Sequence, residues 1–486
     1  MFHLFQKTQM VVHTSIFNRY FLDTVVVIPI ARPQLGSEER AAVDRVLRSG
    51  IIAQGPEVSH FEKEFADMCG VKHAIATSNG TTAGHLAMLA NDIGPGDEVI
   101  TTPFTFFATA SVIMMAGAKP VFVDIEEDGF CLDPEQIEQV AKQLCLAKRP
   151  MFVVGGGAQH ASSEVLRLAE MLQAPVTFFR SGKGVIDERH YLSQSFPAGH
   201  RLWADADVVL AIGTRLKYQQ MYWGLDKNLK ILRIDIDPTE INRISTPELG
   251  IVADARTALE ALLPLVESFN IPRPSRREEL NYLKTEFQEA FEDKIAPQMG
   301  YLRVIREELP EDGFFVDEVT QVGFASWYAF PTYHPRHFIS AGYQGTLGYG
   351  YATALGVQAA HPDKKVIAIA GDGGFLFNVQ ELATAVQYGL GVVVIVFNDN
   401  KFGNVQRQQK ELFGGRIIAS DLHNPDFVQL AESFGLAGYR VRTPDELRPV
   451  LQSTLADSGP ALIEVVVTED MPSPWPFILT PRARPV

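Results

Sequence analysis

The sequence contains little cysteine: Cys69, Cys131 and Cys145 are the three cysteines among 486 residues. Their spacing matches neither a metal-binding pair nor a disulfide framework, as is usual for proteins of a reducing compartment. Positive charge is also scarce, because 43 Lys and Arg stand against 58 Asp and Glu and leave a formal net charge of −15. We therefore expect a cytoplasmic protein that does not bind nucleic acid.

Long hydrophobic runs are absent as well. No stretch of about 20 apolar residues occurs, so we expect no membrane span. In residues 1–27 the apolar residues are interrupted by His, Lys, Asn, Arg and Asp. This segment lacks the apolar stretch of about 7–15 residues and the cleavage site of a signal peptide. We find no internal repeat, and the length is sufficient for three domains.

What the sequence does contain is a glycine-rich loop that follows a short apolar run. Residues 366–370 (VIAIA) are continuously apolar and bounded by polar residues, as is typical of a buried parallel strand. Gly371-Asp372-Gly373-Gly374 follows directly, at the carboxyl end of that expected strand. After the loop, apolar residues at helical spacing over 378–388 predict a helix, which Gly389 ends.

A second apolar run brings the chain back to the same place. Residues 392–397 predict another parallel strand, and Asn398-Asp399-Asn400 follow it. Because a strand, a helix and a return strand of these lengths end at one sheet edge, Asp372 and Asp399 should face a common crevice.

Two carboxylates at one sheet edge suit a hard cation. Mg²⁺ takes about six oxygen ligands, usually a few from the protein and the rest from phosphates and water. Glycines beside Asp372 let backbone N–H groups approach phosphate oxygens closely. Taken alone, the GDG loop would be read as a tight turn and the NDN triplet as a surface loop. Their combination favours a site for a metal-bound diphosphate.

Residues 371–400 resemble the thiamin diphosphate motif of the acetolactate synthase, pyruvate decarboxylase and benzoylformate decarboxylase group. The resemblance implies that Asp372, Asp399 and the carbonyl of Lys401 hold Mg²⁺. It also implies that Gly371, Gly373 and Gly374 lie against the diphosphate. Asp399 stands where that family more often has Asn, so the oxygen ligand is kept and a negative charge is added.

Upstream, residues 342–352 (GYQGTLGYGYA) resemble the segment that lies under the cofactor in this family. The resemblance implies that the carbonyl of Gly345 accepts a hydrogen bond from the aminopyrimidine. It also implies that Leu347 is the apolar wedge that keeps the cofactor bent, which presses the amino group against the carbon it deprotonates. The alternative is that Leu347 is a core leucine near the start of a helix.

The resemblance reaches back to about Pro134. Residues 148–158, 206–215 and 231–238 resemble parts of the family's central domain. In some members the triple glycine, here Gly155–Gly157, and the Arg after a later strand, here Arg215, bind FAD. The glycines can equally form a strand-to-helix turn, and we favour that structural use over FAD binding.

The family normally begins with a pyrimidine-binding domain whose Glu protonates the cofactor ring, and residues 1–134 show no such domain. Glu57, Glu62, Glu64 and Glu98 are more simply interpreted as solvated residues. We therefore assign no catalytic residue.

Residues 28–134 resemble instead the first part of DegT/StrS aminotransferases. The resemblance is carried by residues 28–30, 49–56, 61–66, 76–83 and 94–106.

In that resemblance Asn79–Thr81 would bind the phosphate of pyridoxal phosphate and Phe106 would stack on its ring. The Schiff-base Lys and the Asp that such enzymes need lie later in their fold, and this chain leaves that family before reaching them. We expect no pyridoxal phosphate cofactor.

These observations predict an α/β protein with parallel-sheet domains. The expected organisation is an unassigned extension (1–27), a partial aminotransferase-like domain (28–134), a central domain (135–270), a helical linker (271–305), a diphosphate-binding domain (306–470) and a proline-rich tail over the mouth of the site (471–486).

The function we expect is that of a thiamin diphosphate- and Mg²⁺-dependent enzyme, a carboligase or decarboxylase of 2-oxo acids, working as a homodimer or tetramer. One alternative is a non-catalytic half-site subunit that needs a separate pyrimidine-domain chain. Another is the product of a recombined gene without activity.

Overall fold

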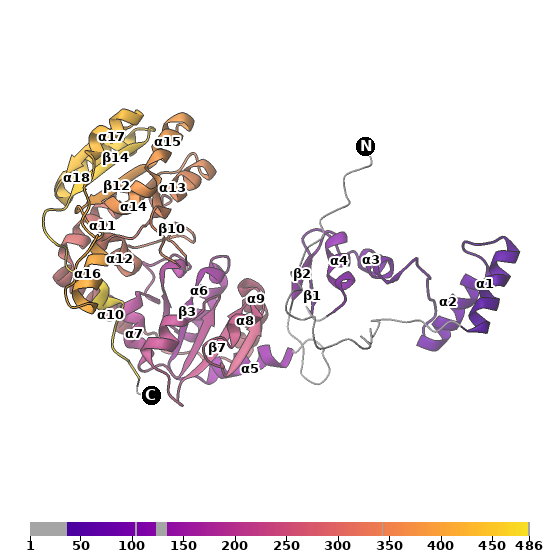
Figure 1. The fold of residues 1–486 in the computed structure, drawn as a ribbon. Helices are drawn as coiled ribbons and strands as arrows, with labels where there is room; N and C mark the ends of the chain where they lie inside the picture. The colour runs from indigo at the N-terminus through magenta and orange to yellow at the C-terminus, as the bar shows by residue number, and fades with distance from the viewer. Residues whose placement is uncertain (1–35, 103–104, 123–133, 343, 485–486) are drawn as a thin grey trace, which may run out of the picture. The chain divides into compact units, whose positions relative to one another are not determined.

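A computed structural model describes residues 36–102, 105–122, 134–342 and 344–484 (Figure 1). The chain divides into two compact units, residues 1–83 and 84–486. The expected extension at residues 1–27, the motif at 28–30 and Cys131 lie outside the described residues. None of the helices in the described part combines the length and the apolarity that crossing a bilayer requires.

In the described part of the first unit, helices α1 (Ser37–Ser49) and α2 (Pro56–Cys69) bury few side chains. Both helices end at a glycine in the left-handed conformation, which glycine adopts without strain. No side chain of α1 is buried, and α2 buries only Ala66. Local capping, rather than packing, therefore defines these helices.

The rest of the aminotransferase-like segment forms a small α/β layer. Strands β1 (Glu98–Thr101) and β2 (Lys119–Phe122) pair in parallel, and α4 (Phe107–Met115) connects them. Helix α3 (Gly80–Ala90) precedes them. The buried apolar residues in the described part of this layer are few: Val112, Ile113, Ala116, Ala118 and Val121.

The central domain is a six-stranded parallel sheet with helices packed on it. Strands β3 and β6 are buried along their whole length, which explains their uninterrupted apolar sequences. The strand order is β5 (Ser193–Gln194), β4 (Val176–Phe178), β3 (Pro150–Val154), β6 (Val208–Ile212), β7 (Lys230–Asp235) and β8 (Leu249–Val252). The helices are α5 (Pro134–Leu146), α6 (Ser162–Leu172), α7 (Phe196–Trp203), α8 (Pro238–Ile241) and α9 (Ala255–Phe269).

Two consecutive helices follow. Helix α10 (Arg277–Lys294) lies within the expected linker, and α11 (Ala296–Glu308) begins in it and continues beyond. Helix α10 buries Leu280, Leu283 and Phe291, so it is a packed element and not a free spacer.

The C-terminal domain is a second six-stranded sheet, again parallel throughout. The strand order is β10 (Phe338–Ile339), β9 (Phe314–Val316), β11 (Val366–Gly371), β12 (Val393–Asn398), β14 (Ala461–Val466) and β13 (Ala437–Val441). Its helices are α12 (Gln321–Ala329), α13 (Tyr349–Ala360), α14 (Asp372–Phe375), α15 (Leu382–Tyr388), α16 (Gly403–Leu412), α17 (Phe427–Phe434) and α18 (Pro444–Ala456). The expected α/β class with parallel sheets is confirmed.

The prediction of a helix over residues 378–388 is wrong at the start of the helix. Helical turns begin at Asp372 with α14, and an irregular 3₁₀ segment (Leu376–Glu381) joins α14 to α15. Asn378 leaves the helical conformation there with a φ of −130°. Its side chain donates a hydrogen bond to the carbonyl of Gly348 at 2.6 Å, and this tertiary contact overrides the local helical pattern.

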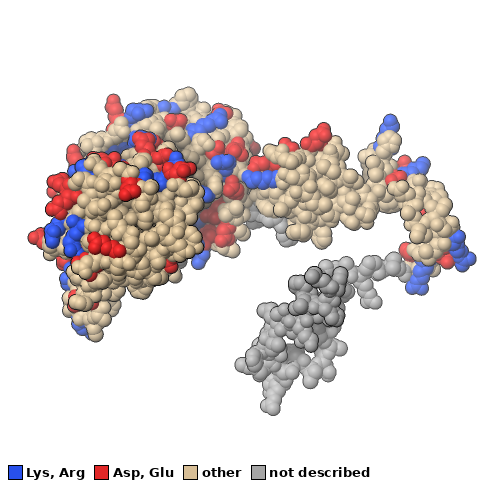
Figure 2. Space-filling view, turned by 90° about the horizontal axis from the view of Figure 1, so that it is seen from above, with Lys and Arg blue, Asp and Glu red and all other residues tan. Residues whose placement is uncertain are grey.

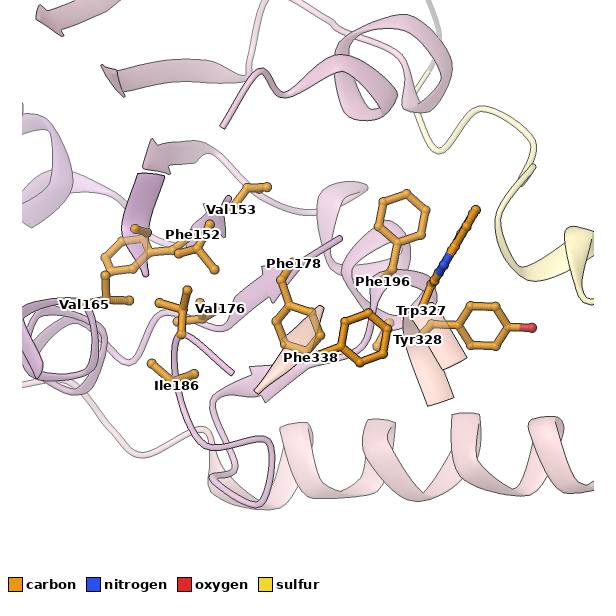
Figure 3. Close-up of a cluster of buried hydrophobic side chains, with 14 of the residues drawn as sticks. Phe152, Val153, Val165, Val176, Phe178, Ile186, Phe196, Trp327, Tyr328 and Phe338 are labelled. Carbon is orange, nitrogen blue, oxygen red and sulfur yellow. The ribbon is translucent and has the colours of Figure 1, made fainter. Parts of the chain in front are cut away.

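The central and C-terminal domains share one apolar core (Figure 3). Phe178 and Phe196 of the central domain lie close to Trp327 and Phe338 of the C-terminal domain in this view. The Phe179 and Trp327 rings meet edge to face with their centroids 5.4 Å apart. Burying large aromatic side chains on both sides of a domain boundary couples the stability of the two domains.

The glycines after β3 pack against the end of β6. A Cβ at Gly155 would lie 2.3 Å from the carbonyl oxygen of Gly213, which no real contact allows. Gly213 itself has a positive φ of 54°. A Cβ at Gly156 would instead meet the Ser181 side chain at an ordinary 3.5 Å. The close backbone approach therefore requires glycine at 155 and not at 156.

This contrast gives a matched pair of variants. Gly155→Ala should destabilise the protein by about 1–3 kcal/mol, because the added methyl forces two backbone segments apart. Gly156→Ala should leave the thermal unfolding midpoint close to that of the unmodified protein. Differential scanning calorimetry of both variants tests the prediction, and equal midpoints for the two would contradict it.

Candidate cofactor site

The register of two strands places the site at the carboxyl edge of the C-terminal sheet. Gly371 of β11 lies opposite Phe397 of β12, so the chain leaves both strands at neighbouring points. A cavity of about 240 Å³ opens there. Every residue that the sequence singled out for the cofactor or the metal lines it: Gly345, Leu347, Gly371, Asp372, Gly373, Gly374, Asp399 and Lys401.

The glycines of the loop line one side of the cavity, which we call the glycine floor, and a side chain at Gly373 or Gly374 would meet neighbouring side chains closely. A Cβ at Gly373 would lie 2.4 Å from the ring of Phe402. A Cβ at Gly374 would lie 2.3 Å from Oε1 of Glu318. Glycine at both positions avoids these close contacts, and both residues line the cavity.

Asp372 is 2% exposed and is held by two donors. The backbone N–H of Gly373 donates to Oδ1 at 2.8 Å, and the Asn424 amide donates to Oδ2 at 2.6 Å. Burial raises the pKa of Asp372 above its usual range. Burial, followed by the nearby charge of Asp372, raises the pKa of Asp399 to about 6. A cation between the two carboxylates would offset the cost of desolvating them.

The protein ligands here are too few to hold a metal alone. Among the residues that the structure describes, no group of three or more His, Cys, Asp or Glu side chains is placed to bind a metal ion. A cation at Asp372 and Asp399 would therefore need backbone, phosphate or water oxygens as well. That mixed ligand set is typical of Mg²⁺, so the residues present fit a Mg²⁺-bound diphosphate.

The backbone after Asp399 is fixed by several contacts. Asn400 has a left-handed φ of 56°, which Asn tolerates better than most residues. The N–H of Lys401 donates to Asp399 Oδ1 at 3.3 Å. The Lys401 ammonium pairs with Asp470. The loop thus turns back immediately beside the second carboxylate.

Leu347 is not a core residue. Its side chain is 37% exposed and lines the cavity two residues before α13 begins at Tyr349. The interpretation of Leu347 as a core leucine is therefore wrong. Gly345 lines the same cavity, and a Cβ there would meet the Val319 side chain at 3.3 Å.

The sequence analysis missed Glu318, which lies behind the glycine floor. It is buried and accepts hydrogen bonds from the N–H groups of Gly348 and Gly350 at 2.6 and 3.2 Å. Burial raises its pKa to about 7. One signal was available, because Asp317 and Glu318 directly follow the apolar run of β9. Asn424, also missed, gives no comparable signal.

The first residue of the tail lies at the cavity. Met471 lines the cavity beside Lys401. Further along the tail, the carbonyl of Pro474 accepts a hydrogen bond from the Tyr328 hydroxyl at 3.1 Å. The N–H of Ala483 donates to the backbone carbonyl of Trp223, in the central domain, at 2.9 Å. The tail therefore extends from the cavity to the central domain.

A second cavity, of about 770 Å³, lies at the triple glycine of the central domain. Gly155–Gly157 and Arg215 line it, together with residues from the ends of β6 and β7. Arg215 also lies 3.4 Å from Glu240. The glycines form a strand-to-helix turn through the Gly155 contact with Gly213, and the same turn borders a cavity.

In the aminotransferase resemblance, Asn79 would lie at the phosphate of pyridoxal phosphate and Phe106 would stack on its ring. In this structure the Asn79 side chain has a hydrogen-bond partner within the chain, and the Phe106 side chain is exposed. Asn79 Oδ1 accepts the N–H of Thr82 at 2.9 Å and so caps α3 itself. Phe106 is 79% exposed. Glu57, Glu64 and Glu98 are exposed and Glu62 is half-buried.

Comparison with known families finds three matches. Residues 318–465 match the C-terminal TPP binding domain of thiamine pyrophosphate enzymes, and residues 137–262 match the central domain of these enzymes. Thiamine pyrophosphate is another name for thiamin diphosphate. Residues 33–176 match the DegT/DnrJ/EryC1/StrS aminotransferase family.

Relatives of the chain are acetolactate synthase large subunits. A "Probable acetolactate synthase large subunit" of Methanocaldococcus jannaschii is 35% identical over 359 residues, which are 69% of this chain and 60% of that protein. The acetolactate synthase large subunit of Haemophilus influenzae is 33% identical over 340 residues, 66% of this chain and 59% of that protein. The isozyme 1 large subunit of Escherichia coli is 30% identical over 346 residues, 68% of this chain and 60% of that protein.

The chain thus spans about three fifths of the length of these curated relatives, 60%, 59% and 60% respectively. The match to the C-terminal TPP binding domain, residues 318–465, includes the paired carboxylates Asp372 and Asp399. Residues 137–262 and 318–465 therefore belong to the thiamine pyrophosphate enzymes, and the match to the DegT/DnrJ/EryC1/StrS aminotransferase family begins before them, at residue 33, and overlaps the first of them up to residue 176.

Proposed function

We propose that the cavity at the carboxyl edge of β11 and β12 binds thiamin diphosphate with Mg²⁺, and that the protein acts on 2-oxo acids as an acetolactate synthase-like carboligase. The observation that carries the proposal is the convergence of all eight singled-out residues on one cavity. They come from three separate segments, residues 345–347, 371–374 and 399–401, and a shared ligand gives their common location a purpose.

Each part of the cavity has a place in this proposal. Asp372, Asp399 and the carbonyl of Lys401 would hold Mg²⁺, and the backbone of Gly371–Gly374 would lie against the diphosphate. Leu347 would support the bent cofactor from below. When bound, thiamin diphosphate supplies the nucleophilic carbon that attacks the keto carbon of a 2-oxo acid.

The chain's own residues prepare this environment. Val319, Phe324 and Leu347 give the cavity an apolar wall that limits the access of water. Glu318 ties Gly348 and Gly350 to the back of the floor, which fixes the segment that carries Leu347. Positioning of this kind is a large part of enzymatic rate enhancement, because it removes the entropy cost of orienting the reactants.

One observation favours the alternative in which the chain is a half-site subunit that needs a separate pyrimidine-domain chain. The relatives extend well beyond the shared region, and apolar side chains of α16 and of the segment that follows it are exposed. Val405, which lines the cavity, is 48% exposed, and Leu412 at the end of α16 is 70% exposed. The further members of this exposed set are Phe413, Ile417 and Ile418.

Contiguous exposed apolar residues beside a site mark an interaction surface. We propose that a separate chain with a pyrimidine-binding domain covers this surface and supplies the missing Glu. A homodimer or tetramer of this chain is part of the same proposal. On the face seen in Figure 2, acidic and basic side chains are interspersed, which is consistent with a small-molecule enzyme that does not bind nucleic acid.

The metal site can be tested without turnover. Thiamin diphosphate should bind only with Mg²⁺ present, and Asp372→Ala should abolish that binding, because one of the two carboxylates is lost. Asp399→Asn is the matched variant and should still bind, since an amide oxygen also coordinates. Isothermal titration calorimetry measures all three proteins. Metal-independent binding, or binding that survives Asp372→Ala, would overturn the assignment.

Turnover can be tested with and without a partner. The purified chain alone should convert pyruvate slowly or not at all, because general acid-base help of about 10²–10⁴-fold is missing. Adding a pyrimidine-domain fragment of a related enzyme should raise the rate of acetolactate formation. Rapid acetolactate formation by the chain alone would show that its own residues supply the acid.

A further inference from the structure

A chain of polar side chains leads from Asp372 away from the cavity. The Asn424 amide nitrogen lies 2.6 Å from Asp372 Oδ2 and 2.8 Å from Asn398 Oδ1. The Asn398 amide nitrogen lies 2.7 Å from Glu464 Oε1. The other oxygen of Glu464, Oε2, lies 2.6 Å from Arg440 Nε. Five side chains thus form one continuous hydrogen-bonded path.

The donors and acceptors allow only one direction along this path. Arg440 donates only, and an ionised Glu464 accepts only, so Glu464 must receive an N–H from Asn398. The oxygen of Asn398 then points at Asn424, which must donate to it. The Asn424 amide carries two hydrogens, and its second one goes to Asp372. The orientation of both amides is therefore set by the protein and not by a ligand.

The path is largely buried and joins five segments of the chain. Asp372, Asn398 and Glu464 are all buried. Glu464 of β14 lies opposite Arg440 of β13 in the sheet, and Asn398 ends the neighbouring strand β12. Asn424 lies between β12 and α17. Hydrogen bonds to charged groups are worth more than neutral ones, and a buried polar atom left without a partner is costly.

We propose that Asn424 is a positioning residue for the metal ligand Asp372, and that Glu464 and Arg440 set its orientation; this rests on the proposed Mg²⁺-thiamin diphosphate site. The Asn424 amide donates a hydrogen bond to Oδ2 of Asp372, and the Gly373 N–H donates one to Oδ1. These two hydrogen bonds hold the carboxylate against rotation about its Cβ–Cγ bond. The lone pairs that remain free are fixed for the cation. Partners that orient a metal ligand in this way affect metal affinity by about 10–100-fold when they are removed.

Asn is well suited to this position. Leu has nearly the same shape but donates no hydrogen bond, so Asp372 Oδ2 and Asn398 Oδ1 would both lose a donor. Asp would place a third carboxylate against Asp372 and would also fail to donate. Asn424→Leu is therefore the variant that removes the hydrogen bonds with the least change in charge and volume.

The experiment compares Asn424→Leu with Asn281→Leu, a control on the exposed face of α10. Thiamin diphosphate binding is titrated by calorimetry over a range of Mg²⁺ concentrations. Asn424→Leu should raise the Mg²⁺ concentration needed for half-maximal binding about 10-fold or more, and the control should not. At saturating Mg²⁺, its affinity for thiamin diphosphate should return close to that of the unmodified protein, which a purely structural defect would not allow.

The outcomes separate this proposal from the one it rests on. If the unmodified protein shows no Mg²⁺-dependent binding, both proposals are overturned. If it binds while Asn424→Leu needs no additional Mg²⁺, or if excess Mg²⁺ fails to restore binding by the folded variant, only the positioning role is overturned. If Asn424→Leu does not fold, Glu464→Gln is the variant that tests the role. Gln has the shape of Glu, but its amide can donate, so it no longer forces the Asn398 amide into one orientation. That variant should also need more Mg²⁺, and an unchanged requirement would refute the role.

Discussion

The site depends on the parallel register of β11 and β12. Gly371 lies opposite Phe397, so Asp372 and Asp399 emerge at neighbouring points of one sheet edge. A shift of one residue would turn every side chain of a strand to the other face of the sheet. The paired carboxylates, the glycine floor and the contact of Asn398 with Asn424 would then be lost together. The uninterrupted apolar core on both faces of these strands holds the register.

Sequence reasoning reached this site because its signals are local. A buried strand, a glycine loop and a return strand lie within residues 366–400, and their pattern fixes which side chains share an edge. Glu318 and Asn424 were not predicted as site residues, because their contacts form only when distant parts of the chain fold together. Asn424 meets Asp372 across 52 residues and precedes α17 without any periodic pattern. The kink at Asn378 was not predicted for the same reason, since a contact with Gly348 determines it.

The aminotransferase-like segment shows that a family match and a complete fold are different properties. Motifs in residues 28–134 predicted the relationship, and the match at residues 33–176 bears it out. In the described part, however, α1 buries no side chain and the β1–β2 layer buries few apolar residues: Val112, Ile113, Ala116, Ala118 and Val121. Helix caps such as Gly50 and Gly70 follow from local sequence, whereas a core requires apolar side chains from several elements that are buried together.

The shared core of the central and C-terminal domains limits where such a gene can be cut and rejoined. A crossover between α9 and α12 would separate Phe178 and Phe196 from Trp327 and Phe338, and each fragment would expose aromatic surface that the other had covered. A crossover on the amino-terminal side of α5 spares that surface, because Val140, Ala141 and Leu144 of α5 remain with the sheet they cover. Natural or engineered chimaeras of this architecture should therefore tolerate exchange in front of α5 and resist it in the middle of the chain.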